Sequence, residues 1–233
     1  MRMVNSKSHN AVLKTESSNA LKIFLSILAI AFCFFIPHYA NLPIFIYPIV
    51  VLIVVWLYLK YISKENFSDI FFSFKRFRVK AIWIGIIVAI LLSLFFRFAW
   101  DPFINKIIPS GRIDLSDFAS IRNSPVNYAI ILLLALLVGG FYEEIIFHGF
   151  IFTRLEKIFK GKRATITAFM LTTIIFGFYH FQQGLKGILL TAIAGAVYHV
   201  LILKFNRNLW YGVFAHAFFD FIGLTLIYLG KLS

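Results

Sequence analysis

Two adjacent acidic residues lie in the middle of an apolar stretch of the chain. Glu143 and Glu144 interrupt residues 128–152, which are otherwise almost wholly apolar. If that stretch crosses a bilayer, each ionised carboxylate costs several kcal/mol unless it is paired, neutralised or hydrated. Acidic side chains inside a membrane are therefore candidates for a functional site, and the residues that meet them decide the chemistry.

Few other ionisable side chains lie in apolar segments. Among the 10 acidic residues, only Asp220 joins the two glutamates, and most of the 6 histidines are placed similarly. These histidines are His148, His180, His199 and His216. On an α-helix, residues four apart share a face, so Glu144 is expected to pair with His148, and His216 with Asp220. Glu143 has no ionisable residue three or four positions away, which makes it the stronger candidate for chemistry.

A carboxylate with two histidines and a further acid suits the activation of water for hydrolysis. Glu143 could act as general base, with His180 holding the same water molecule. His216 and Asp220 could stabilise the oxyanion that develops on an attacked amide. The set contains no serine or cysteine, which argues against a covalent mechanism. Alternatively, Glu143, His180 and His216 could bind a divalent metal such as Zn²⁺, although the HExxH arrangement of soluble zinc proteases is absent.

The composition is that of a polytopic helical membrane protein. Hydrophobic residues make up 61% of the chain and charged residues only 14%, which excludes an ordinary soluble domain. The single cysteine, Cys33, excludes a disulfide framework and a cysteine-based zinc cluster. Lys and Arg outnumber the acids by 23 to 10. In a membrane protein this excess favours basic cytoplasmic loops over nucleic-acid binding, so we expect no nucleic-acid partner.

Apolar runs of about 20 residues, the length of a membrane-spanning helix, recur along the chain. They predict an all-α fold with seven spans in one bundle. The expected spans cover residues 21–37, 44–62, 81–96, 125–154, 164–181, 187–203 and 209–229. Residues 63–80, where basic residues alternate with phenylalanines, could form a plain basic loop or an interfacial segment on an anionic leaflet. If this segment partly inserts, it adds an eighth span.

The distribution of Lys and Arg predicts the orientation of the spans. The N-terminal tail and residues 60–80, 154–163 and 204–208 are basic, whereas the intervening loops are poorer in basic residues. Because basic loops stay in the cytoplasm, the N-terminus is expected inside the cell membrane and the C-terminus outside. The longest connection, residues 101–124, is expected to lie outside as a polar loop.

Three short motifs, one on each of three expected spans, resemble those of one family. The stretch Glu143-Glu144-Ile-Ile-Phe-His148-Gly149 is similar to the EExxxR-G motif of the CPBP family, which comprises intramembrane CAAX-type proteases and bacteriocin-processing proteins. Phe176-Gly-Phe-Tyr-His180 matches its FxxxH motif, and His216-Ala-Phe-Phe-Asp220 matches its HxxxN/D motif. The resemblance covers roughly residues 125–225, and the three motifs occur in the family's order.

The resemblance implies a helical membrane endopeptidase with three parts. These are a cytoplasmic tail over residues 1–20, N-terminal membrane helices over 21–124, and a catalytic membrane domain over 125–229. It implies that Glu143 activates water beside His180 and that His216 and Asp220 form the oxyanion side, with Glu144 and His148 in support. The implied partners are the lipid bilayer and a membrane-associated protein or peptide substrate. Relatives cleave prenylated CAAX proteins, or act in peptide maturation and bacteriocin self-immunity.

One residue departs from the family pattern. His148 stands where the motif has arginine. Arginine is always charged and would neutralise Glu144 through a forked pair, whereas histidine does so only when protonated. We therefore expect a weaker, pH-sensitive pair at this place. The departure also leaves two other readings open: a catalytically impaired immunity or partner-binding protein on the same fold, and a transporter or channel that uses buried Glu and His as a proton relay.

Overall fold

The computed structural model describes residues 3–109 and 113–232, with side chains from residue 19 onward. Every regular element in these residues is helical, so the expected all-α class is confirmed. Tertiary contacts divide the chain into two compact units, Met1–Asn66 and Phe67–Ser233, where the sequence predicted one bundle.

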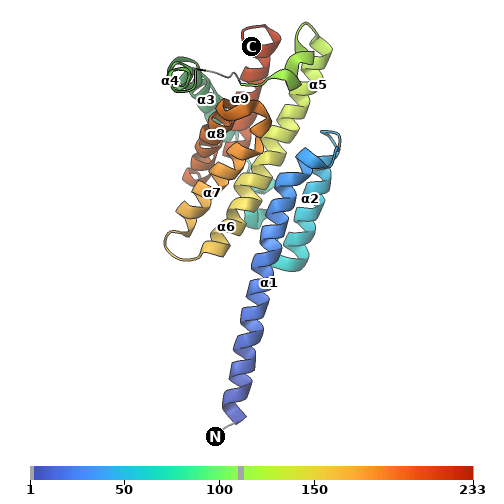
Figure 1. The fold of residues 1–233 in the computed structure, drawn as a ribbon, viewed down its shortest axis with the longest axis vertical. Coiled ribbons are helices and arrows are strands. Elements are labelled where there is room, and N and C mark those ends of the chain that lie inside the picture. The colour runs from blue at the N-terminus through green and yellow to red at the C-terminus, as the bar shows by residue number, and fades with distance from the viewer. Residues whose placement is uncertain (1–2, 110–112, 233) are drawn as a thin grey trace. The chain divides into compact units, whose positions relative to one another are not determined.

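The first unit is a pair of packed helices, coloured blue to cyan in Figure 1. Helix α1 spans Met3–Tyr39, and α2 spans Tyr47–Leu57 before it continues as the π-helical turn η1, Tyr58–Ser63. The Ser26 and Tyr58 hydroxyls share a hydrogen bond of 2.6 Å between the two helices. The expected N-terminal tail is part of α1 rather than a separate segment, because residues 3–18 contain no glycine or proline to interrupt the helix.

The second unit begins with two short 3₁₀ turns, η2 (Phe67–Ile70) and η3 (Phe74–Arg76). These turns lie in the basic segment 63–80 and are far too short to cross a bilayer. Next comes one continuous helical run made of α3 (Val79–Phe95), the π-helical η4 (Phe96–Trp100) and α4 (Asp101–Ile107).

That run is longer than the sequence predicted. The expected span ended at residue 96 and a polar loop followed from residue 101, whereas the helix continues to Ile107. Pro102 does not break it, because the proline directly follows the π-helical turn η4, and local π-helical adjustment of the backbone hydrogen bonds tolerates a proline inside a helix. Of the expected loop, residues 110–112 lie outside the described residues, and residues 116–121 form the 3₁₀ helix η5, Ser116–Ile121.

The second half of this unit contains four helical rods. The first is continuous through α5 (Pro125–Ala135), the π-helical η6 (Leu136–Ile151) and α6 (Phe152–Phe159). Ser124 caps its start by accepting a hydrogen bond from the backbone N–H of Asn127, at 3.3 Å. The others are α7 (Ala164–Tyr179), then η7 (Phe181–Gln183) with α8 (Gly184–Lys204), and α9 (Trp210–Tyr228).

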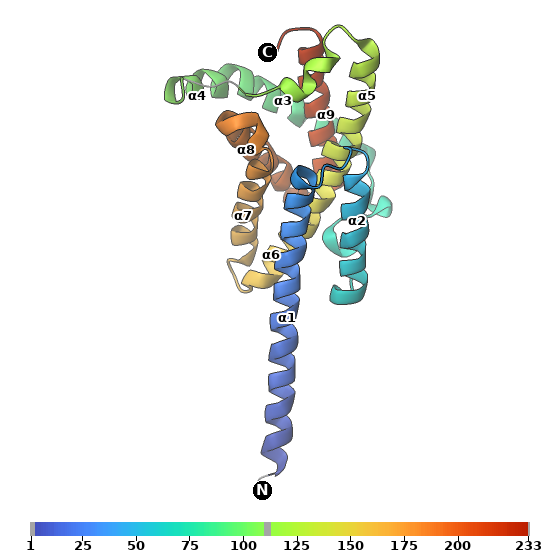
Figure 2. The ribbon, with the colours of Figure 1, turned by 45° about the vertical axis from the view of Figure 1, so that its right-hand side comes forward.

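Helix α9 is the centre of the second unit. It packs against α3, α5, η6 and α8, while α7 packs against α6 and α8 (Figures 1 and 2). Residues from α9, η6 and α8 therefore face one another although they are far apart in the sequence. This packing positions the polar residues described below.

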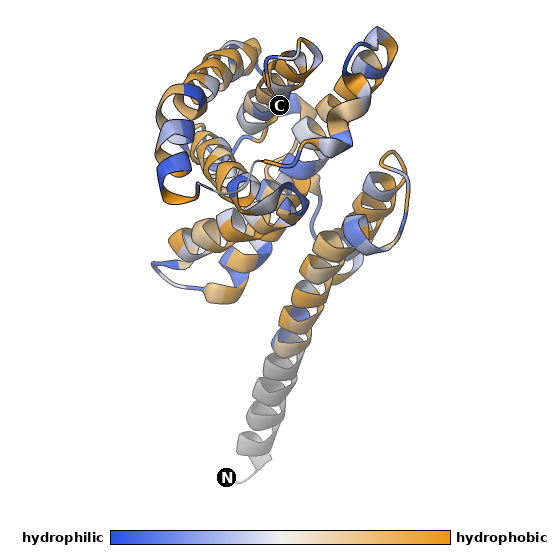
Figure 3. Cartoon of the chain, turned by 45° about the horizontal axis from the view of Figure 1, so that its top comes forward, coloured by the Kyte–Doolittle hydropathy of each residue, from blue (hydrophilic) through white to orange (hydrophobic). Residues whose placement is uncertain are grey.

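Several helices have the length and composition of membrane spans. Within the described residues, 5 helices qualify: Asn19–Tyr39, Val79–Ile107, Pro125–Phe159, Phe181–Lys204 and Trp210–Tyr228. The helices Tyr47–Ser63 and Ala164–Tyr179 are apolar but shorter, so the expected count of seven or eight spans is not confirmed. Most turns of these helices are coloured as hydrophobic in Figure 3, and hydrophilic residues are frequent at helix ends and in the connecting loops. The chain is therefore a helical membrane protein.

Candidate functional site

The structure brings together all the polar residues singled out in the expected spans. Glu143, Glu144 and His148 lie on η6, His180 follows the last residue of α7, His199 lies on α8, and His216 and Asp220 lie on α9. His216 Nε2 lies 4.0 Å from Glu143 Oε2, so these two side chains lie at the same depth in the helix bundle.

The segment that carries the glutamates is a π-helix over Leu136–Ile151, rather than the α-helix assumed from the sequence. At its end, the backbone N–H of Phe152 points to the carbonyl of Phe147, five residues earlier. π-helical turns are rare in proteins as a whole, but those that do occur are frequently found at functional sites. Both glutamates are buried in the interior of the unit although they are neighbours in the sequence.

Glu143 faces two histidines and retains some accessible surface. Its Oε2 atom is 3.7 Å from His180 Nε2, and 10% of the glutamate side chain and 14% of the histidine side chain are accessible. Among the described residues, this buried oxygen has no hydrogen-bond partner. The distance is short enough for one water molecule to contact both Glu143 and His180.

His180 is held in a defined tautomer by its own helix. Its Nδ1 lies 3.0 Å from the carbonyl oxygen of Phe176, which can only accept, so Nδ1 carries the donated proton. In the neutral ring, Nε2 is then an acceptor and faces Glu143. This arrangement suits a water molecule that donates one hydrogen to the imidazole and the other to the carboxylate.

Glu144 is fully buried and has a different set of partners from Glu143. Its Oε1 atom is 3.0 Å from His216 Nδ1 and 3.7 Å from His148 Nε2. The sequence predicted only the pairing with His148, because i, i+4 spacing along one helix is visible there. The shorter contact is made to α9, and it orients the His216 ring so that Nε2 points towards Glu143.

Two residues on α8 belong to this cluster, and the sequence argument did not assign them a role in it. His199 Nδ1 lies 2.7 Å from His148 Nδ1, in a hydrogen bond between fully buried rings. Tyr198 stacks on His216, with ring centroids 4.7 Å apart and an interplanar angle of 21°. The only sign of these two residues in the sequence was that Tyr198 and His199 form a polar pair within an otherwise apolar run. His199, next to Tyr198, stands apart from the other three histidines in the sequence, which favours a bystander or packing role for it.

Asp220 completes the cluster at its more accessible side. Its Oδ2 atom is 3.6 Å from His216 Nε2, and 26% of its side chain is accessible. Gly139 borders this place: a Cβ atom added there would collide with Asp220 Oδ2 and lie 3.4 Å from His216 Nε2. The absence of a side chain at residue 139 thus keeps the space beside these two groups open.

We predict that Gly139→Ala lowers the activity of this site without unfolding the protein. The added methyl group must displace the Asp220 carboxylate and crowd His216 Nε2, and small misplacements of reacting groups lower rates by about 10²-fold. The measurement is the rate at which the purified protein, at matched concentration, cleaves a peptide substrate, the reaction that the resemblance implies. Gly223→Ala on α9 is the control, since a Cβ atom there meets nothing within 4 Å. Equal activity of the two variants would contradict the prediction.

The sequence left open a metal ion held by Glu143, His180 and His216. Among the described residues, no group of three or more His, Cys, Asp or Glu side chains is arranged to hold one. One of these candidates, His216, directs Nδ1 to Glu144, and its Nε2 lies between Glu143 and Asp220. A bound metal ion stays an expectation from the sequence, and no catalytic step is assigned to one.

The fold and the site together define a helical membrane protein with a buried acid–histidine centre between η6, α7, α8 and α9. Residues 125–222 match the family described as type II CAAX prenyl endopeptidase Rce1-like. This match agrees with the resemblance drawn from the three motifs, and it supports an intramembrane protease in general. No curated protein and no solved structure matches the chain.

Proposed function

We propose that the protein is an intramembrane endopeptidase that hydrolyses a peptide bond of a membrane-associated protein or peptide. The observation that carries this proposal is the position of Glu143 Oε2. This oxygen is buried, lacks a hydrogen-bond partner among the described residues, and lies 3.7 Å from His180 Nε2. A carboxylate and an imidazole so placed can activate a water molecule that contacts both.

In the proposed reaction, Glu143 takes a proton from water while the water oxygen attacks the carbonyl carbon of the scissile bond. His180 orients that water through Nε2. The proton held by Glu143 then passes to the leaving nitrogen as the C–N bond breaks, which yields a carboxylate and an amine.

The negative charge on the attacked oxygen needs a donor. His216 Nε2 faces the site, and Glu144 accepts from its Nδ1, so a protonated His216 ring can donate to this oxyanion while Glu144 stabilises its charge. Asp220, 3.6 Å from Nε2, holds the ring from the accessible side. Glu144 and His148 act in support, because they are fully buried and do not reach the accessible side.

The orientation of the protein in the cell membrane belongs to this proposal too. The helix ends at residues 154–163 and 204–208 carry the basic loops, which places them in the cytoplasm together with the N-terminus, and the C-terminus outside. The substrates would be CAAX-type prenylated proteins or peptides of the bacteriocin-processing kind. Both reach the site from the membrane.

The test is peptide cleavage by the full chain reconstituted in lipid vesicles. The substrates are a farnesylated CAAX peptide and the same peptide without the lipid. Glu143→Ala and His180→Ala, each at the wild-type protein level, are expected to reduce cleavage to background. Asp117→Ala removes a carboxylate from an exposed 3₁₀ helix and should leave the rate unchanged. If both site variants stay fully active in the protein's biological effect, the partner-binding alternative is favoured.

A further inference from the structure

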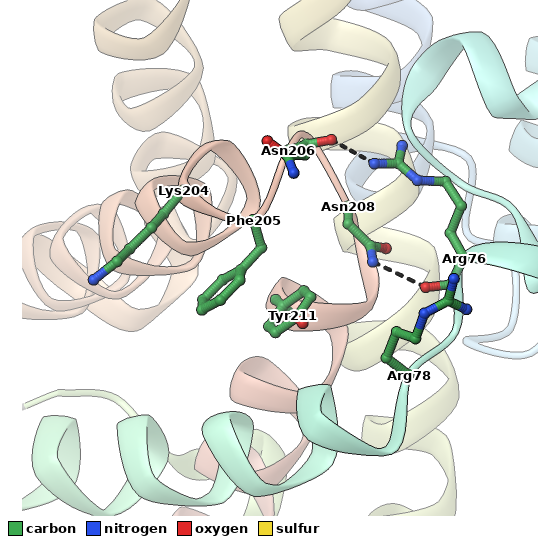
Figure 4. A pocket seen from close by; sticks show the side chains of 7 residues that line it. All are labelled: Arg76, Arg78, Lys204, Phe205, Asn206, Asn208 and Tyr211. Atoms are coloured by element: carbon green, nitrogen blue, oxygen red, sulfur yellow. Dashed lines mark hydrogen bonds between the residues drawn. The ribbon is translucent and has the colours of Figure 1, made fainter.

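A second polar site lies at the N-terminal end of α9, and its lining residues in and around the α8–α9 turn precede His216 by 5 to 12 residues in the sequence. It is a cavity of about 270 Å³ in the second unit, between the segment before α3 and the turn that joins α8 to α9 (Figure 4). The lining residues are Arg76, Arg78, Lys204, Phe205, Asn206, Asn208 and Tyr211. The proposed protease chemistry uses none of them.

The walls of this cavity are held in place by their own contacts. Arg76 donates to the backbone carbonyls of Asn206 and Arg207, and Asn208 Nδ2 donates to the carbonyl of Arg76 at 2.9 Å. Phe205 and Tyr211 stack face to face, with ring centroids 3.9 Å apart. The two chain segments are therefore tied together, and the cavity is a built feature of the fold.

The charge of the cavity is not balanced by the protein. Its lining contains three basic residues and no acid, and within the described part of the chain none of the three is ion-paired to a carboxylate. Arg78 directs NH1 to the carbonyls of Lys75 and Phe77, which leaves Nε and NH2 for a ligand. The nearby Arg207 is already committed to Glu156, at 2.7 Å, and this hydrogen bond raises the pKa of Arg207 above its ordinary value.

The position of the cavity along the helices indicates the source of the ligand. Arg78 immediately precedes the span Val79–Ile107, Lys204 ends the span Phe181–Lys204, and Tyr211 lies in the first turn of the span Trp210–Tyr228. The cavity thus lies where three candidate membrane helices reach the edge of the hydrocarbon layer. Lipid headgroups occupy this level of a bilayer.

We propose that this cavity binds the phosphate group of an anionic phospholipid. Arg78 and Lys204 supply the positive charge, the Asn206 amide supplies a neutral donor, and the stacked Phe205–Tyr211 pair forms an apolar wall for the glycerol and upper acyl region. A bound lipid would join the start of α3 to the α8–α9 turn. It would thereby stabilise the packing of α3 against α9.

The experiment measures the melting temperature of the full chain in a neutral detergent against the concentration of added ligand. The probes are dioctanoyl phosphatidylglycerol, the zwitterionic dioctanoyl phosphatidylcholine, and inorganic phosphate. For the wild type we expect a saturable rise with phosphatidylglycerol that phosphatidylcholine does not reproduce at equal concentration. If inorganic phosphate alone gives the full rise, the site binds a soluble phosphate and the lipid source is wrong.

Arg78→Gln/Lys204→Gln removes two exposed charges from the cavity and is expected to raise the half-saturating lipid concentration about tenfold or more. Lys204→Gln alone should raise the half-saturating lipid concentration about fivefold. This single variant still tests the proposal if the double variant folds poorly. Lys160→Gln/Lys162→Gln is the matched control, because it removes the same charge at the same end of the helices outside the cavity. Wild-type binding by the Arg78/Lys204 variant, or equal weakening in the control, would overturn the proposal.

Discussion

Replacing Glu143 by Gln is expected to lower the rate of peptide cleavage by about 10²–10⁴-fold, the usual contribution of a general base. The amide has the size and shape of the carboxyl group but cannot accept a proton from water. In the proposed reaction Glu143 contacts the attacking water rather than the substrate, so the effect should fall on kcat far more than on KM. The measurement is the steady-state cleavage of the peptide substrate in vesicles.

The same variant should keep its stability, which separates a chemical role of Glu143 from a structural one. In the described structure its Oε2 atom accepts no hydrogen bond, so the protein loses little when the charge is removed. The contacts of Glu143 with His180 and His216, at 3.7 and 4.0 Å, are too long for hydrogen bonds, so the burial of its charge is poorly compensated and its removal can raise the melting temperature. A Gln variant that cleaves at more than a tenth of the wild-type rate would refute the assignment of Glu143 as base.

Replacing Glu144 by Ala is expected to lower the free energy of unfolding by about 3–5 kcal/mol, the range for breaking a buried charged pair. Glu144 is fully buried and accepts from His216 Nδ1 at 3.0 Å, with His148 Nε2 at 3.7 Å. Its loss leaves His216 Nδ1 without its acceptor, removes the carboxylate beside His148 Nε2, and opens a void between η6 and α9. The measurement is unfolding of the detergent-solubilised protein, followed by heat or denaturant.

Glu143→Ala is the control for this stability effect, since it removes the same atoms from the neighbouring residue. Its carboxylate is partly accessible and its Oε2 accepts no hydrogen bond from any described residue, so a clearly smaller loss of stability is expected. The two neighbouring glutamates should therefore differ in opposite ways, one mainly in activity and the other mainly in stability. Equal losses of stability would show that the division between them is wrong.

The fold class and the candidate site residues can be predicted from the sequence, because the signals for both are local. Apolar runs of span length predict helices whatever their neighbours are, so the all-α membrane class could be predicted without coordinates. The cost of burying charge made Glu143, Glu144 and Asp220 stand out against their apolar surroundings. The three motifs indicated the family that residues 125–222 match, and the structure gathers their Glu, His and Asp residues around one place.

The sequence misjudged features that depend on backbone geometry. Helical periodicity assumes one turn size, so the π-helix over Leu136–Ile151 was not expected. The sequence ended one span at residue 96 and predicted a polar loop from residue 101, whereas the helix continues through the π-helical turn η4 and past Pro102 to Ile107. Both errors concern the backbone hydrogen-bond pattern of a helical turn, which depends on how neighbouring helices pack and not only on the local sequence.

Only the tertiary structure decided which partners each polar residue has. Spacing along one helix pairs Glu144 with His148, but the packing of α9 against η6 gives Glu144 a closer partner in His216. The packing of α8 likewise brings His199 within 2.7 Å of His148. Contacts between helices depend on crossing angles and side-chain volumes that no single segment encodes. The sequence by itself thus determined which residues could do chemistry, and the packing of four helices determined which of them meet.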